Sequence, residues 1–63
     1  MKGIRLEVRG GGEYWVPVAD FAIGIYAMES ARALSVSDDR LWRVVDERWP
    51  EPTTIVYENG VAR

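Results

Sequence analysis

A strict alternation of apolar and charged residues opens the chain and limits its possible folds more than any other feature. Across residues 4–9 the apolar side chains fall on one side of an extended segment and the charged ones on the other, as in a half-buried strand. Three glycines at 10–12 supply the positive φ angles of a hairpin turn, and residues 13–18 are rich in aromatic and β-branched types. We therefore predict a β-hairpin over residues 2–18. Pro17 cannot donate a ladder hydrogen bond, so the second strand should end there or lie at a sheet edge.

The next segment has the spacing of a helix. Asp20 is a suitable N-cap, because its carboxylate can accept from the free amides of the first turn, and residues 21–34 follow with helical periodicity. Small residues line one side of this helix, at Gly24, Ala27 and Ala31. We favour packing of this strip inside the molecule. The alternative is the seam of a homodimer, with Ile25 and Tyr26 beside it.

A second helix is predicted over residues 38–49. Ser37 is a good N-cap, and two aspartates in the first turn would complement the helix dipole. One side of this helix would be apolar, at Leu41, Trp42, Val45 and Trp49, and the opposite side charged, at Asp39, Arg43, Asp46 and Glu47. Core positions are therefore expected for Trp42 and Trp49. Pro50 ends the helix.

Residues 53–58 are rich in β-branched side chains and are expected to form a third strand, followed by a turn at Asn59-Gly60. The predicted order of elements is ββααβ. We expect one α+β domain over residues 1–63, in which a three-stranded antiparallel sheet carries both helices on one face.

Several kinds of chemistry are excluded by what the chain lacks. It has no cysteine and no histidine, which removes disulfides, thiol nucleophiles and nearly every zinc arrangement. Its paired acids lack the spacing of a calcium loop, and the glycines at 10–12 lack the lysine of a phosphate-binding loop. We therefore expect no enzyme, no cofactor and no metal. The longest apolar stretch, residues 21–28, is far too short to cross a membrane, so we expect a cytoplasmic protein.

Trp15 has two interpretations that the sequence leaves open. Tyr14 has the same strand parity as Val16 and Val18, which places Trp15 on the outward side. An outward tryptophan is a candidate interface anchor, because aromatic residues dominate interface energetics. In the other interpretation, Trp15 lies along its own sheet beside the stems of arginines.

Short motifs in the second half of the chain match one family of DNA-binding proteins. They are Ala31, Ala33 and Leu34, the turn Val36-Ser37, then Leu41-Trp42-Arg43, Trp49-Pro50-Glu51-Pro52 and Asn59-Gly60. In this arrangement residues 31–63 resemble the helix-turn-helix and wing of phage excisionases and related prophage activators. The resemblance implies a DNA-binding regulator in which Arg40 and Arg43 contact the groove and Arg63 lies near a phosphate.

The overall character of the chain indicates a different partner. It is 63 residues long with a net charge of −2, and in size, acidity and lack of cofactor sites it is similar to anti-CRISPR proteins, inhibitors from phages and mobile elements. The acids expected on the second helix, Asp38, Asp39, Asp46 and Glu47, would cover a basic, nucleic-acid-handling surface of a host protein. DNA-binding domains usually carry a clear excess of Lys and Arg. We therefore favour a non-enzymatic, protein-binding inhibitor, with Trp15 and Tyr26 as further contacts, over a DNA-binding regulator.

Overall fold

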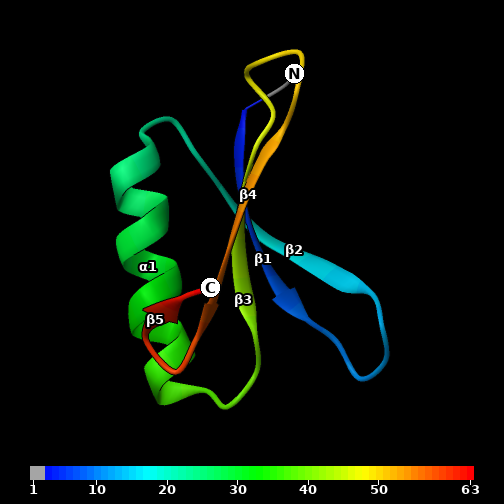
Figure 1. The fold of residues 1–63 in the computed structure, drawn as a ribbon, viewed down its shortest axis with the longest axis vertical. Helices are drawn as coiled ribbons and strands as arrows, with labels where there is room; N and C mark the ends of the chain where they lie inside the picture. The colour runs from blue at the N-terminus through cyan, green and yellow to red at the C-terminus, as the bar shows by residue number, and fades with distance from the viewer. Residues whose placement is uncertain (1–2) are drawn as a thin grey trace.

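One sheet and one helix make up the part of the chain that the computed structural model describes, residues 3–63 (Figure 1). The elements in chain order are β1 (Ile4–Arg9), β2 (Trp15–Phe21), α1 (Gly24–Ser37), β3 (Trp42–Asp46), β4 (Thr53–Glu58) and β5 (Val61–Ala62). The five strands form an antiparallel sheet in the order β2-β1-β3-β4-β5, with α1 packed on one face. The expected α+β class is therefore correct, but the three-stranded sheet with two helices is wrong.

The predicted hairpin is confirmed for the strands that the structure describes, β1 and β2, while residue 2 lies outside the described residues. At its turn the ring of Tyr14 lies on Gly10 so closely that a Cβ at Gly10 would collide with the ring. Pro17 lies in an edge strand, as one of the two interpretations expected, and the strand continues to Phe21. The register shifts between Leu6 and Glu7, so β2 carries a bulge next to its proline.

α1 covers the sheet through its small residues. Ala27 and Ala31 have no exposed surface, which allows the helix backbone to approach the central strands closely. The core formed in this way consists of Ile4, Leu6, Val8, Ala27, Ala31, Trp42, Val44 and Tyr57. Packing of the small strip inside the molecule is therefore confirmed, and the strip is not available as the seam of a dimer.

Both ends of α1 differ from the prediction by a few residues. Asp20 belongs to β2, so it is not the N-cap; Ile23 occupies that position and makes no side-chain cap hydrogen bond. At the other end the helix runs on to Ser37, and the amide of Asp38 donates to the carbonyl of Leu34 at 2.8 Å. Within residues 3–63 no helix has the length and apolar character needed to span a membrane.

The second helix predicted over residues 38–49 is wrong, because its middle forms the central strand β3. Trp42 and Val44 face α1 and the core, and the residues between and after them face the other side of the sheet. A strand at this place pairs along its whole length with a neighbouring strand on each side, β1 and β4. The adjacent β-branched residues Val44 and Val45 also favour a strand, so tertiary pairing decides against the helical pattern.

The two tryptophans assigned to that helix therefore separate. Trp42 is 5% exposed, so its predicted core position is confirmed. Trp49 is 61% exposed in the β3–β4 connection, so its predicted core position is wrong. The reason is that a strand and a loop do not place residues seven apart on one side, as a helix would.

The strand and the turn near the C-terminal end are confirmed as β4 and its connection to β5. Asn59 and Gly60 both have positive φ, 53° and 85°, which is the geometry of a two-residue hairpin turn. The amide of Gly60 donates to the hydroxyl of Ser35 at 2.8 Å and so fastens the turn to α1.

Candidate functional site

The sheet face opposite α1 is covered by no helix or strand in residues 3–63, and we call it the uncovered face (Figure 1). Side chains alternate along each strand, so the neighbours of the core residues point to this side. The uncovered face is formed by Arg5, Glu7, Arg9, Trp15, Arg43, Val45, Thr54 and Val56. It therefore combines charged and apolar groups on the two central strands and their neighbours.

Glu7 is the centre of the uncovered face. It pairs with Arg43 in the β1–β3 register, and although no element lies above it, it is only 4% exposed. Its carboxylate accepts hydrogen bonds from Nε of Arg5 at 2.5 Å and from Nε of Arg43 at 2.6 Å. Burial alone would raise the pKa of Glu7, but the two guanidinium groups outweigh it and lower the pKa below its ordinary value.

The ion pairs continue along the face from Glu7. A terminal nitrogen of Arg5 donates to Glu47 at 2.6 Å, so Arg5 joins two carboxylates from different parts of the chain. These two hydrogen bonds, first that of Glu7 and then that of Glu47, raise the pKa of Arg5. The central arginines are thereby held in fixed positions, with their charge partly neutralised.

Trp15 lies against this charged cluster. The guanidinium carbon of Arg43 lies 4.3 Å from the centre of the indole ring, and that of Arg9 lies 5.8 Å from it. These distances are in the range of cation–π attraction. Trp15 is therefore outward on the sheet and packed beside arginines, as the second sequence-based interpretation expected, while its role as an interface anchor stays a prediction.

The environment of Glu7 is unsuited to acid catalysis. A carboxylate held between two guanidinium groups stays ionised near neutral pH, so Glu7 is a poor general acid, and each of its two oxygens already accepts a hydrogen bond. The described residues 3–63 contain no group of acidic side chains placed to hold a metal ion. A rigid tryptophan flanked by arginines is instead typical of an interface anchor.

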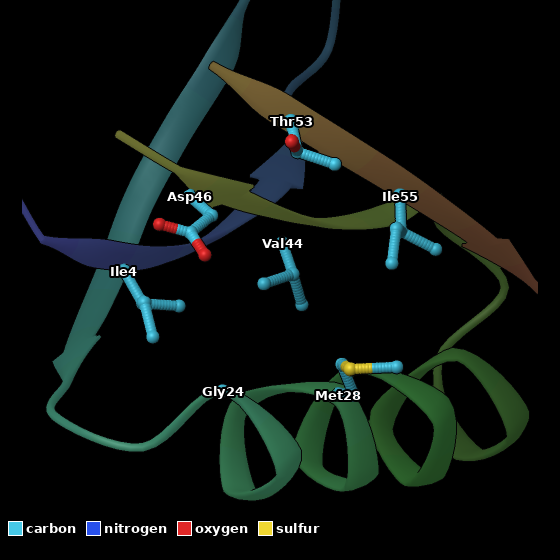
Figure 2. Close-up of a pocket in the computed structure, with 7 residues that line it drawn as sticks. All are labelled: Ile4, Gly24, Met28, Val44, Asp46, Thr53 and Ile55. Carbon is cyan, nitrogen blue, oxygen red and sulfur yellow. The ribbon is translucent and has the colours of Figure 1, made fainter. Parts of the chain in front are cut away.

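The surface has two hollows, and the second of them borders the uncovered face at Arg5. A cavity of about 80 Å³ opens between α1 and the sheet and is lined by Ile4, Gly24, Met28, Val44, Asp46, Thr53 and Ile55 (Figure 2). Its lining is mostly apolar, and the carboxylate of Asp46 in its wall is bonded to Arg48. A second hollow of about 480 Å³ lies beside β1 and is lined by Gly3, Ile4, Arg5, Asp20, Phe21, Ala22 and Arg48. Both arginines there already have carboxylate partners, whereas Asp20 has no ion pair within residues 3–63.

The acids predicted to share one helix face are separated by the fold. Asp38 follows α1 and binds Arg40, while Asp46 ends β3 and binds Arg48, both through side-chain and backbone hydrogen bonds that lower the pKa of each aspartate. Glu47 is occupied by Arg5. Asp39 is exposed in the turn between α1 and β3. The predicted acidic surface therefore does not exist as one face, because the helix that would have created it is a strand.

The arginines predicted to contact DNA are also dispersed. Arg40 lies in the turn before β3 and pairs with Asp38, and Arg43 lies on β3 beside Glu7. Arg63 follows β5 and lies 3.5 Å from a carboxylate oxygen of Glu58. The structure thus brings Arg43 to Trp15, but it places the three arginines on no common helix.

Tyr26 and Trp49 are exposed on other parts of the molecule. Tyr26 is 58% exposed on α1, on the layer opposite the uncovered face. It therefore does not join Trp15 in one site.

Three charged residues of the uncovered face were not among the predicted contacts: Arg5, Glu7 and Arg9. Their alternation with apolar residues marked them as the outward side of a strand. Their meeting with Arg43 follows from the pairing of β1 with β3, which the helical interpretation of residues 38–49 concealed.

No protein-family model, no curated protein and no solved structure matches this chain.

Proposed function

We propose that this domain is a protein-binding module without catalytic activity and that it binds through the uncovered face, with Trp15 as the anchor. The observation that carries the proposal is the stacking of Trp15 with Arg43, which the nearly buried carboxylate of Glu7 holds in place. The side chains are ordered before a partner arrives, so binding loses less conformational entropy than it would on a flexible surface.

The sheet face is a better candidate than the sheet edge. A partner strand that added to β2 would meet Pro17, which has no N–H to donate, and a bulge in the same strand. At the other edge, β5 already occupies part of β4. Strand addition is therefore disfavoured at β2 and limited at the other edge to the first half of β4, and the side chains of the face offer the larger surface.

A protein partner fits the charges of the face better than a nucleic acid does. Glu7 and Glu47 take up Arg5 and Arg43, so among the arginines of this face Arg9 alone has no carboxylate partner in the described residues. The whole chain is acidic, with a net charge of −2. Phosphate binding needs several free cations, whereas one arginine beside a tryptophan suits an acidic side chain next to an apolar patch.

The proposal includes a cytoplasmic location, in keeping with a sequence that has no cysteine. A role as an inhibitor from a phage or mobile element stays a prediction based on size and acidic character. The acidic helix face that supported this role in the sequence does not form, so the search for a partner should start from the uncovered face.

A photo-crosslinking experiment tests the proposal. A crosslinking amino acid at Thr54 samples the uncovered face next to Val45, and the same group at Ala33 samples the exposed side of α1. We expect the Thr54 probe to capture a protein from a cell extract of the source organism, and Trp15→Ala in the same chain to abolish that product. The Ala33 probe should not capture it.

Two results would contradict the proposal. One is a product that survives Trp15→Ala or appears equally from Ala33. The other is salt-sensitive binding of the unmodified chain to single- or double-stranded DNA or RNA at about 50 mM salt, where phosphate affinity is strongest.

A further inference from the structure

The outer side of α1 carries an exposed strip that the fold leaves largely uncovered, with one end, at Val36, next to Gly60 of the β4–β5 turn. The strip consists of Ile25, Glu29, Arg32 and Val36, all exposed, and at 100° per residue these four lie within about 60° of one another. Ile25 is 58% exposed and Val36 60%. Their spacing of four, three and four residues is that of a coiled-coil seam.

The two charged residues of the strip stand apart from the rest of the molecule. The other arginines of the described residues each bind a carboxylate or, in the case of Arg9, a backbone carbonyl and the ring of Trp15. Arg32 has neither a side-chain hydrogen bond nor an aromatic partner within residues 3–63, and Glu29 has no ion pair there. The strip therefore offers one free charge of each sign between two apolar residues.

We propose that two copies of this chain associate through this strip of α1. The two helices run antiparallel, and the two-fold axis crosses the middle of the strip, at the height along the helix of the step from Ser30 to Ala31. This arrangement places Glu29 opposite the second copy's Arg32, and Arg32 opposite its Glu29. It also places Ile25 opposite the second copy's Val36 at both ends. The strip is thus complementary to itself, as an isologous interface requires. A parallel pair would instead bring like charges together, which is unfavourable.

The interface is small, so the association is weak. A helix of 14 residues is about 21 Å long, and a single helix pair falls at the low end of interface sizes. The two sheets would lie on the outside of the dimer, so each uncovered face stays accessible. The proposal is therefore independent of what the uncovered face binds.

Sedimentation equilibrium with charge-reversed variants tests the dimer. We expect the unmodified chain, of 7.2 kDa, to approach twice that mass as its concentration rises from about 10 µM to 1 mM, the range of weak interfaces. Glu29→Arg and Arg32→Glu should each weaken association at least about tenfold, because each creates like-charge pairs. Mixing the two variants should restore a dimer, and so should the chain that carries both substitutions. Glu51→Arg, an equal charge change in the β3–β4 connection, should leave association unchanged.

Circular dichroism and thermal unfolding of each variant show that the monomer is folded, as expected for exposed positions. The proposal is overturned by an unmodified chain that stays monomeric at about 1 mM, a concentration at which even weak interfaces associate. It is also overturned if the single reversals leave association unchanged, or if neither the mixture nor the double variant restores it.

Discussion

At the scale of single residues, Glu7 organises the uncovered face. A buried carboxylate is costly unless its charge and hydrogen-bonding capacity are met, and here Arg5 and Arg43 meet them from two strands. Arg43 in turn stacks on Trp15, so one carboxylate sets the position of the aromatic anchor through its arginine partner. The residue thus links the stability of the sheet to the shape of the proposed interface.

Glu7→Gln should destabilise the domain by about 2–3 kcal/mol, because the amide leaves a guanidinium charge unpaired on the nearly buried face. Chemical denaturation measures the loss. Glu47→Gln provides the control: its carboxylate is more exposed, with 32% side-chain exposure, and its removal should cost less than about 1 kcal/mol. Equal losses for both variants would contradict a central role of Glu7.

The unmodified chain and the Glu7→Gln variant should also differ in how their stability depends on pH. The pKa of Glu7 is lower in the folded domain than its ordinary value of 4.5, so the ionised carboxylate stabilises the fold above that value. This contribution is lost as the pH falls below 4.5 through the folded pKa. The difference in unfolding free energy between the unmodified chain and Glu7→Gln should therefore be constant near neutral pH and shrink in acid. A difference that grows in acid would contradict the assignment.

At the scale of elements, α1 depends on small residues where it meets the sheet. Ala31 has no exposed surface, whereas Ala33 on the same helix is exposed. Larger side chains at the contact would push the helix away from β1 and β3. The helix can therefore accept bulk on its outer side and not on its inner side.

Ala31→Leu should destabilise the domain by about 1–3 kcal/mol through overpacking, and Ala33→Leu should change stability by less than about 0.5 kcal/mol. Thermal unfolding at a low protein concentration measures both effects. Similar losses for the two variants would show that helix propensity, and not contact with the sheet, limits substitution in α1.

Elements with local signals could be predicted from the sequence. The alternation in β1, the glycines after it and the Asn59-Gly60 turn each act through neighbouring residues, and they are found as expected. Residues 38–49 could not be assigned in this way. Leu41, Trp42 and Val45 fit a helical stripe, and Trp42 and Val44 fit a strand equally well. The pairing with β1, about 40 positions away in sequence, decides between them, and no local pattern reports it.

The candidate site was predicted in part for the same reason. The outward position of Trp15 follows from strand parity alone, and the structure places it on the uncovered face. Its contact with Arg43 and the role of Glu7 depend on which strand lies next to β1. The helix wrongly predicted over residues 38–49 therefore placed the acids on one surface that the fold does not have, and it concealed the arginine cluster around Glu7.

At the scale of the whole molecule, the two layers present different surfaces. The sheet exposes a fixed cluster of Trp15 and arginines, and α1 exposes a self-complementary strip on the opposite side. A dimer through α1 would carry two uncovered faces pointing outward. Such a molecule could bind two copies of a partner, or two sites on one partner, with increased avidity.

The central claim is that Trp15 anchors a protein partner, and the dissociation constant of the captured partner for three chains tests it most directly. Trp49 is the matched control, because it is also a tryptophan near an arginine, with Arg48 at 6.0 Å, but it lies in the β3–β4 connection. We predict that Trp15→Ala weakens binding at least about 30-fold, the loss expected at an interface hot spot, and that Trp49→Ala weakens it less than about threefold. Equal affinities for Trp15→Ala and the unmodified chain, or a larger loss for Trp49→Ala, would contradict the claim.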